Sequence, residues 1–499
     1  MKLRTILGVG VSAAVLLPAG ARAQSLADLL PRLISESVTM SSTATLPKGS
    51  GNPHEAHFLP AAAQFKAPYA LNGAIVSQLA TFPLGSSSGG FTYSSDTPTG
   101  IPKRSSSNFG PAFAERALTI GKGKFSTGVN YQHVEFDRFD GVALNGGPKF
   151  YLQHNDCCPN QNADGTPNPQ AGVGPTQDAN PFFEGDLVQD VLNLSVKTDT
   201  VALFANYGLS RTLDVGVAIP FVTVDLNASM TSNILRLSTD SNRQIHTFGG
   251  ASPDTKVSHE SGSKTGLGDV LLRGKWNFAT ERGGGFALGL DLRLPTGDKN
   301  NLLGTGATQA KLALIYSQDF GRFAPHFNAG YTYSSGQLPA SVGTYNLGDE
   351  VPVPTQPAAS GAYQNVFAGQ TPTSALSSSD LKVPDEINYT VGFVLAPSPR
   401  ISITADFIGR TLRDTKAFGI VTKEYGYRPS PGGSLIPKQF DDAFDITNPS
   451  ANVNILLGVA GVKLNLTKTL LLNANVIFPL SNAGLRPKVT PVIGLDYAF

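Results

Sequence analysis

The sequence is poor in charge and in long apolar runs. Charged residues make up 15% of the 499 positions, whereas soluble domains carry about 25%. Beyond the N-terminal segment, no uninterrupted apolar run reaches the length of about 20 residues that a membrane-spanning helix needs. The nearest stretch, Val453 to Leu480, is broken by Lys463, Lys468 and Pro479. Together with 53 glycines and 14 tyrosines, these shortages favour a lipid-exposed sheet over a packed soluble core.

Neither positive nor negative charge predominates in the sequence. The chain holds 38 basic and 37 acidic residues, which argues against a nucleic-acid partner, because such partners need a concentrated basic face.

Cysteine is nearly absent, and its two copies, Cys157 and Cys158, are adjacent. A strained vicinal bridge, metal capture and a loop without chemical role are the alternatives, of which the last is favoured because neighbouring cysteines have little reach for a relaxed disulfide. The following Asn160, Asn162, Asp164 and Gly165 have the spacing that opens a calcium loop, but Ala171 stands where the closing glutamate belongs. We therefore expect no metal site and no cofactor.

Catalytic motifs are weak. Gly85-Ser-Ser-Ser-Gly89 fits the nucleophile-elbow pattern, but it lies in a Ser/Gly-rich stretch instead of a strand-to-helix turn. Gly262-Ser-Lys-Thr265 lacks the leading half of a phosphate loop. The seven histidines, including His54, His57, His133 and His326, show no metal-ligand spacing. The sequence does not predict an enzyme; an envelope lipase is the third and least favoured interpretation.

The N-terminus reads as a secretory signal over residues 1–23. Lys2 and Arg4 precede an apolar stretch, Ile6 to Leu17, and Ala21-Arg-Ala23 supplies a small-x-small cleavage site. Residues 24–66 follow without a strand period. A short helix is expected there, with Ser25 as its cap and Leu26, Leu29, Leu30, Leu33 and Ile34 as its apolar stripe. This segment is either a plug inside a barrel or a periplasmic tail.

From about residue 67 to the end, apolar residues recur at every second position. The clearest runs are Leu213 to Phe221, Val270 to Phe278, Phe286 to Leu294 and Ile387 to Leu395. A period of two is that of a β-strand, and about 9–11 residues suffice for a tilted strand to cross a bilayer. Tyr331, Tyr333, Tyr497 and Phe499 fall near strand ends, where aromatic girdles lie. The sequence predicts an all-β fold, a transmembrane antiparallel β-barrel of the bacterial outer membrane, over residues 67–499.

Tight turns and long connections alternate, as in barrels with short periplasmic turns and long outer loops. The tight turns lie near residues 121–123, 210–212, 281–284, 320–322, 397–400 and 466–468, and the expected outer connections are 85–108, 139–186, 231–264, 297–307, 335–384, 415–450 and a short loop at 481–486. With Leu71 to Leu84 as a first strand and residues 487–499 as the last, the pattern predicts about fourteen strands, or twelve or sixteen if one hairpin is assigned wrongly.

Charges fall on one face of these strands, the face expected to line the lumen. The candidates are Asp269, Arg273, Lys275, Asp291, Arg293, Lys311, Asp319, Asp406, Arg410, Lys463 and Asp496. Isolated burial of such groups is expensive. They are therefore expected either to brace the wall and hold a plug or to line a permeation path, and the similar number of both signs does not indicate strong ion selectivity.

The last strand ends in Tyr497 and Phe499, which resemble the C-terminal recognition strand of outer-membrane barrels. This resemblance implies that the barrel-assembly machinery is a partner, and the lipid of the outer membrane is another.

Five segments of the middle of the chain are distinctive: Tyr207 to Phe221, Gly266 to Val270, Leu290 to Asp298 with Leu303 to Gly306, and Asp319 to Phe323. Together they resemble one family, the outer-membrane proteins assigned to the meta-pathway of phenol degradation. The likeness covers about 200–499 well and includes Phe109 to Pro111 and Thr119 to Gly123 more loosely. More distantly, the chain is similar to fatty-acid and hydrocarbon transporters whose N-terminus plugs the barrel. The resemblance implies uptake of aromatic or other hydrophobic compounds and carries over no binding residues.

We therefore expect a monomeric outer-membrane channel for passive uptake of small hydrophobic or aromatic solutes. The alternative is a structural or surface-interaction barrel without transport. The sequence does not name the solute.

Overall fold

The computed structural model describes residues 25–41, 58, 66–85, 90–95, 102–104, 106, 108–153, 185–240, 243–281, 283–336, 382–427, 429–430, 434, 436–467 and 469–499. The predicted signal peptide, most of residues 42–65, the serines of the elbow-like motif, and Cys157 to Gly165 lie outside these ranges.

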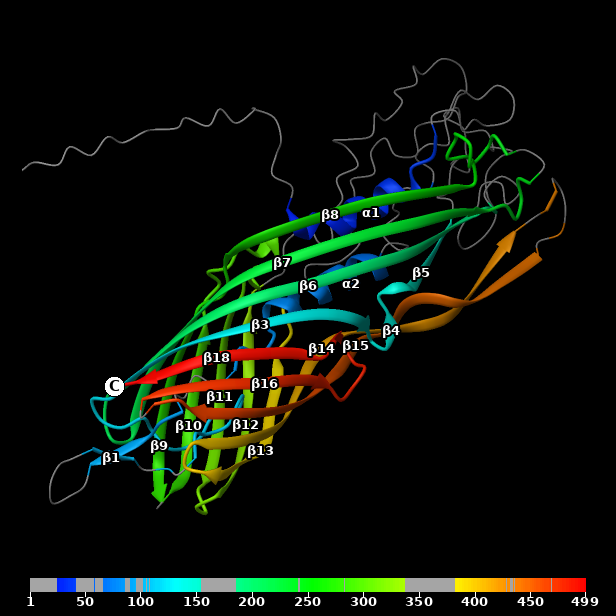
Figure 1. Cartoon of the computed structure of the whole chain (residues 1–499). Helices are drawn as coiled ribbons and strands as arrows, with labels where there is room; N and C mark the ends of the chain where they lie inside the picture. Colours follow the sequence, from blue (N-terminus) through cyan, green and yellow to red (C-terminus); the bar gives the residue numbers. More distant parts are fainter. Residues whose placement is uncertain are drawn as a thin grey trace, which may run out of the picture.

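Twelve antiparallel strands close into a barrel, and four further strands extend its wall (Figure 1). The barrel strands are β3 (Phe125–Phe139), β6 (Leu187–Gly208), β7 (Leu213–Leu235), β9 (Leu271–Glu281), β10 (Gly284–Arg293), β11 (Thr308–Gln318), β12 (Phe323–Ser335), β13 (Glu386–Ser398), β14 (Ile401–Tyr427), β15 (Ile436–Asn465), β16 (Leu470–Pro479) and β18 (Thr490–Ala498). The extra strands are β4 (Val142–Ala143), β5 (Asn145–Gln153), β8 (Thr255–Leu267) and β17 (Leu485–Pro487).

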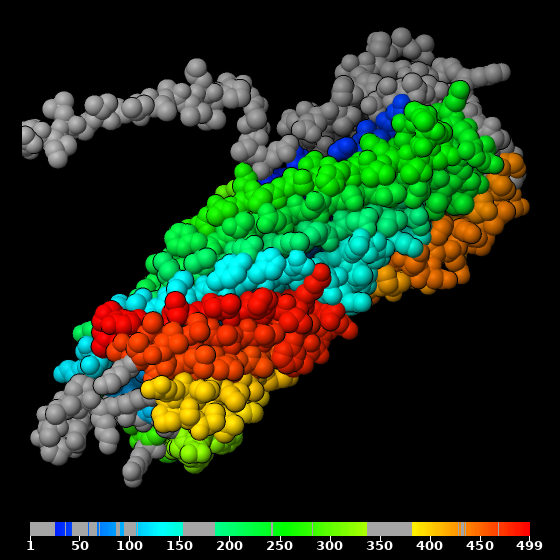
Figure 2. All heavy atoms as spheres, viewed as in Figure 1, coloured from blue at the N-terminus to red at the C-terminus, as the bar shows by residue number. Residues whose placement is uncertain are grey.

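The first and last barrel strands seal the cylinder. On one edge β3 pairs with β18, where Gln132 faces Val492, and on the other it pairs with β6, where Phe125 faces Tyr207. Figure 2 shows the same closure as a continuous outer surface, with the cyan β3 directly beside the red C-terminal strands. Closure leaves no free strand edge at lipid depth, as the hydrocarbon core requires.

The outward face of the barrel is apolar over one band and polar above it. On β7 the predicted alternation is confirmed: Val215 and Phe221 are exposed, whereas Asp214 and Ala218, at positions of the opposite parity, are buried. Beyond Phe221, the outward-facing side chains of β7 become polar, as at Asp225. An apolar band about 25 Å tall is what a lipid-facing barrel presents.

Aromatic side chains border this band at both ends. Tyr497 and Phe499 are exposed at the end that carries the tight turns, and the ring of Phe499 lies 5.7 Å from that of Phe125. Tyr331 and Tyr333 are exposed near the opposite end of β12. Because short turns lie on the periplasmic side of such barrels, the turn end is the periplasmic end.

Several segments predicted as outer loops are in fact strands. The hairpin of β14 and β15 stays paired from Ile401–Leu464 to Tyr427–Ile436, with register shifts along the way. Likewise β7 and β8 stay paired up to Asn233–Thr255. The outer halves of these strands face water instead of lipid on their outward side and therefore lack apolar alternation. The alternation of apolar residues in the sequence does not predict them for this reason. The wall therefore rises far above the apolar band on these sides (Figure 1).

The expected number of fourteen strands is corrected to twelve, and both surplus strands lie before Phe125. Leu71 to Leu84, predicted as a strand, belongs mainly to helix α2 (Lys66–Ala80). Residues 108–120, read as the strand before the turn at Gly121, form no strand. The other five predicted tight turns each join two barrel strands.

The segment 85–108, predicted as an outer loop, is also corrected. It contains the short hairpin of β1 (Tyr93–Ser95) and β2 (Pro102–Arg104). Phe91, just before it, packs with Phe109, Leu471 and Ala498 at the periplasmic end, and Figure 1 places β1 near the C-terminus. The chain has thus already crossed the lumen before the barrel begins.

Helices fill the outer half of the barrel. A 3-10 turn η1 (Leu26–Asp28) leads into α1 (Leu29–Val38), and a second short turn, η3 (Lys299–Asn301), lies between β10 and β11. The predicted stripe on α1 is confirmed: Leu26, Leu29, Leu30, Leu33 and Ile34 are all buried in a core shared with the inner faces of β6 and β7. Helix α2 is buried on every side, with Leu71, Ile75 and Val76 within 1% of full burial. Among the residues that the structure describes, no helix is both long and apolar enough to cross a membrane.

A buried carboxylate joins helix α1 to the outer part of the wall. Asp190 of β6 lies above the apolar band and accepts hydrogen bonds from Ser37 Oγ of α1, at 3.0 Å, and from Ser232 Oγ of β7. Burial disfavours the charged form and raises the pKa of Asp190 to about 7, while its two hydroxyl donors and the positive charge of Lys256 act in the opposite direction. The protonated form therefore suits this site better than the carboxylate.

Docking of α1 should therefore weaken as the pH rises. Because the pKa of Asp190 is higher in the folded state than in an exposed carboxyl, its contribution is fully present below about pH 4 and lost as the pH rises through about 7. Hydrogen–deuterium exchange of the α1 amides, corrected for intrinsic rates, should show less protection at pH 8 than at pH 5.5. An Asp190→Asn variant should hold its protection constant, and an unchanged pH dependence in that variant would contradict the assignment.

Candidate functional site: the floor and cavities of the lumen

Residues 108–120 cross the lumen near its periplasmic end, and we call this segment the floor. At the end near β14 and β15, Asp406 accepts hydrogen bonds from the backbone N–H groups of Ala112, at 3.2 Å, and Phe113, at 2.9 Å. Lys463 donates to the carbonyl of Pro111 at 2.6 Å. Two of the predicted luminal charges thus bind backbone groups that have no helix or strand partner.

The opposite end of the floor is held in the same way. The N–H of Ala117 donates to Ser317 Oγ at 2.8 Å, and its carbonyl accepts from Asn277 at 2.9 Å. Lys275 donates to the carbonyl of Leu118 at 3.0 Å. Side chains from several strands therefore supply the hydrogen bonds that a helix would have made internally.

Further wall side chains hold the approach to the floor and its middle. Asp319 accepts hydrogen bonds from Ser106 Oγ and Asn108 Nδ2, at 2.8 and 3.1 Å. Asn328 exchanges two hydrogen bonds with the backbone of Glu115. Some of the predicted luminal charges thus hold a segment of the lumen other than residues 24–66, where a plug was predicted.

Three cavities lie along the inner wall and share lining residues. The upper cavity, about 30 Å³, lies beside the end of α2 against Pro220, Val222 and Leu303. The middle cavity, about 160 Å³, lies between Thr81 and Phe113 of the floor. The lower cavity, about 40 Å³, lies against floor residues 115–120.

Four shared residues, three of them charged, mark the boundaries between these cavities. Leu84 and Arg293 line both the upper and the middle cavity, and Arg273 and Asp291 line both the middle and the lower one. The Arg273 guanidinium lies 3.5 Å from Asp291 and 3.4 Å from Glu115 of the floor. The three spaces thus follow one another in series, with an ion-paired arginine between the last two.

The eleven predicted luminal residues divide into two groups and two single residues. Lys275, Asp319, Asp406 and Lys463 hold the floor or its approach, and Arg273, Asp291, Arg293, Lys311 and Arg410 line the middle cavity. Asp269 instead ties down the connection after β10, through the N–H groups of Gly297 and Thr305. Asp496 accepts a hydrogen bond from Asn473 of the neighbouring strand.

Sequence reasoning missed several residues of the same interior. Asp214 and Glu386 stand at inward-facing positions of their strands. The apolar alternation of these two strands therefore predicts that both carboxylates face the lumen. Asp214 accepts the N–H of Ile120, and Glu386 binds Arg410 at 2.6 Å. The sequence does not predict Glu115 as a cavity residue, because the floor has no regular alternation of apolar and polar residues.

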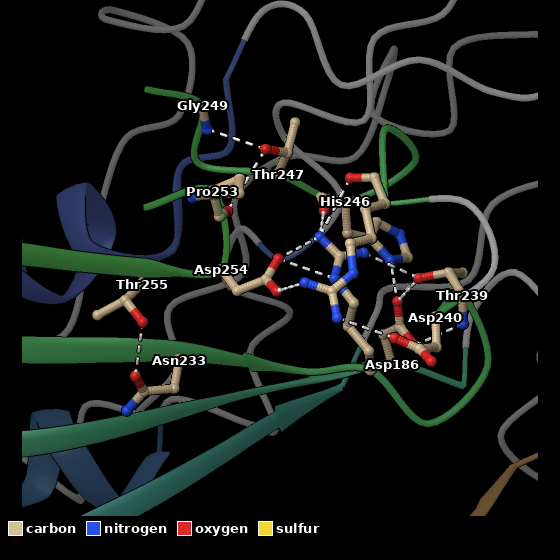
Figure 3. Close-up of polar contacts among 12 residues, drawn as sticks. Asp186, Asn233, Thr239, Asp240, His246, Thr247, Gly249, Pro253, Asp254 and Thr255 are labelled. Atoms are coloured by element: carbon tan, nitrogen blue, oxygen red, sulfur yellow. Dashed lines mark hydrogen bonds and ion pairs between the residues drawn. The ribbon is translucent and has the colours of Figure 1, made fainter. Parts of the chain in front are cut away.

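A separate polar network lies at the outer end of the wall, between β7 and β8 (Figure 3). The buried side chain of Asp186 accepts from His246 Nδ1 at 2.8 Å. Arg236 and Arg243 both bind Asp254, at 2.6 and 2.9 Å. The arginine contacts lie within the β7–β8 connection, and Asp186, directly before β6, ties His246 of that connection to the neighbouring strand. They brace the outer end of the wall and form no part of the luminal site.

The remaining motifs and histidines have structural surroundings where they are described. Gly262 to Thr265 lies inside β8 and forms no phosphate loop. His326 pairs with Asp406 at 2.6 Å, and His133 with Asp199 at 2.8 Å. Within the described ranges, no group of three or more His, Cys, Asp or Glu residues could hold a metal ion.

Residues 170–374 match the family model described as "Putative MetA-pathway of phenol degradation". The predicted family resemblance is confirmed over this range, whereas residues 375–499 and the looser likeness at 109–123 lie outside the match. The matched range contains all five sequence segments that carry the resemblance. No curated protein sequence matches the chain. The family match, the closed barrel and its apolar band identify a protein of the bacterial outer membrane.

Solved outer-membrane structures resemble the chain only in arrangement. A channel from Pseudomonas putida F1 is 10% identical with a TM-score of 0.39, and the alignment covers 77% of this chain and 98% of that one. A FadL homologue from Pseudomonas aeruginosa is 10% identical at 0.30, over 76% and 90%. CymD, a monoaromatic hydrocarbon channel, is 10% identical at 0.27, over 76% and 89%. At these scores the likeness carries no argument about function.

Removing the carboxylate of Asp406 should destabilise the folded protein. An Asp406→Ala variant leaves the N–H groups of Ala112 and Phe113 and the ring of His326 without their acceptor, at about 1–3 kcal/mol for each buried group. Urea unfolding of the protein refolded in lipid vesicles measures the change. Asp225→Ala, on the outward face of β7, is the control and should stay within about 0.5 kcal/mol; equal losses in both variants would contradict the role of Asp406.

Proposed function

We propose that the protein is an outer-membrane channel through which small hydrophobic or aromatic compounds enter by passive diffusion, and that it acts as a monomer. The observation that carries this proposal is the series of three cavities, which descends from the end of α2 to the floor and is linked by shared lining residues. A closed structural barrel would have no need of such a series.

The size of the middle cavity and the apolar part of its lining support a small solute with one ring. Its volume of about 160 Å³ is close to that of an apolar cavity of about 150 Å³ that admits benzene. Phe113, Leu84, Leu271 and Ile408 supply apolar surface, and the polar remainder keeps the site hydrated when no solute is bound. A solute of one ring fits; a larger one requires the wall or floor to shift.

Two barriers stand in this path: an ion-paired arginine between the middle and lower cavities, and the floor below them. The arginine is Arg273, which pairs with both Asp291 and Glu115. Because Glu115 belongs to the floor, any shift of the floor also breaks one of these pairs. The floor rests on individual side-chain hydrogen bonds instead of a continuous ladder, so it can move without opening the barrel. We propose that this shift is the permeation step.

A locked floor should block passage. With Cys157 and Cys158 replaced by serine, an Ala117→Cys/Ser317→Cys pair joins the floor to β11 at a point where the two residues already share a 2.8 Å hydrogen bond. Planar-bilayer conductance and uptake of aromatic solutes into vesicles should fall at least about tenfold on oxidation and recover on reduction. Equal conductance and uptake in both redox states would overturn the proposed step.

The structural or surface-interaction barrel is the second candidate. It is favoured by the core that fills the outer half of the barrel around α1 and α2. Silence of the wild-type protein in the same conductance and uptake measurements, with folding verified, would favour this candidate over the channel.

We also propose that the C-terminal strand carries the signal for the barrel-assembly machinery. Tyr497 and Phe499 are outward-facing, and Phe499 N donates to the carbonyl of Phe125, so the signal also lies at the barrel seam.

Removal of Phe499 should lower the amount of protein assembled in the outer membrane. The matched control is Phe320→Ala, which removes an exposed aromatic from a tight turn at the same end. Folded and unfolded protein in outer-membrane fractions can be counted by their migration on gels without heating. If both variants assemble equally well, the terminal aromatic is not a signal.

A further inference from the structure

The middle cavity has an unbalanced charge. Four cationic side chains line it, Arg273, Arg293, Lys311 and Arg410, against two carboxylates, Asp291 and Glu386. The luminal set as a whole balances its signs, so the excess is local. In a barrel interior, such an excess must be met by water, by a counter-ion or by a solute.

Two of the four cations are already committed to carboxylates. Arg410 forms a forked pair with Glu386, at 2.6 and 3.1 Å, and donates to Thr81 at 2.7 Å. Arg273 is shared between Asp291 and Glu115. These pairs account for both carboxylates that line the cavity, and they leave the other two cations for a further anion.

Arg293 and Lys311 form no ion pair with any residue that the structure describes. Arg293 donates to the carbonyl of Ala80, at the C-terminus of α2, at 2.9 Å, and a carbonyl carries only part of a negative charge. Lys311 stands directly opposite Asp291 in the pairing of β10 with β11. The carboxylate of Asp291 is nevertheless directed to Arg273, and the ammonium group of Lys311 stays unpaired.

We infer that the middle cavity is a binding site for a monocyclic aromatic compound that carries a carboxylate. This inference rests on the proposed channel function and specifies its solute class. The ring lies against the apolar side chains of Phe113, Leu84 and Ile408, and the carboxylate is held by Lys311 and Arg293. A neutral ring of the same size fits the same volume but leaves the ammonium group of Lys311 without a counter-charge, so it binds less tightly.

Isothermal titration calorimetry on the folded mature protein at pH 8 tests the site with benzoate and benzamide. The two probes share their shape and differ in charge. Wild-type protein should bind benzoate about tenfold more tightly than benzamide, as expected for one charge-assisted hydrogen bond. Lys311→Met should lower the affinity for benzoate about tenfold and leave that for benzamide unchanged, and Lys311→Arg should restore the preference.

Lys488→Met is the matched control, because this lysine is exposed and paired with Glu135 on the outside of the barrel; its binding of both probes should equal that of the wild type. Equal affinity of the wild type for the two probes, or an equal loss of both in Lys311→Met, overturns the anion site. Vesicle uptake separates this from the parent proposal. A wild-type protein that passes benzamide without preferring benzoate overturns the anion site alone, whereas one that passes neither overturns the channel.

Discussion

The structure depends on finding hydrogen-bond partners for the backbone of the floor, a segment inside the barrel that is neither helix nor strand. In the floor, each N–H and C=O group that lies away from water needs a partner, and the wall supplies it through single side chains such as Asp406, Lys463 and Asn277. The luminal charges Lys275, Asp406 and Lys463 are therefore placed by the path of the chain before the barrel. Both signs occur among these three, since carbonyls need cationic donors and N–H groups need carboxylates.

The same constraint connects fold to function. A floor held by a ladder of backbone bonds would be as rigid as the wall, whereas one held by separate side chains yields where a few bonds break. The cavities lie where the chain leaves the wall uncovered, between the apolar core around α1 and α2 and the floor. Arg273 connects these parts, because its two carboxylate partners belong to the wall and to the floor.

The sequence predicts well where the environment is periodic. Strands such as Leu213 to Phe221 face lipid on one side, so their alternation and five of the tight turns were readable. Helix α2 was not, because a helix buried on all sides has no polar face, and its short apolar run can be read as a strand. The outer halves of β14 and β15 face water on their outer side and so lack the apolar alternation. The alternation of strand positions predicts which charges face inward, but only the tertiary path tells which of them are paired.

Accessibility of single cysteines along the cavities tests the central claim most directly. In a protein whose Cys157 and Cys158 are replaced by serine, Thr200→Cys, Thr390→Cys and Asn206→Cys place one thiol in the upper, middle and lower cavity. A small charged thiol reagent should reduce conductance at all three positions and leave it unchanged at Thr127→Cys, on the exposed outer face of β3. If the reagent modifies the three luminal thiols and the current does not change, the cavities are not the path.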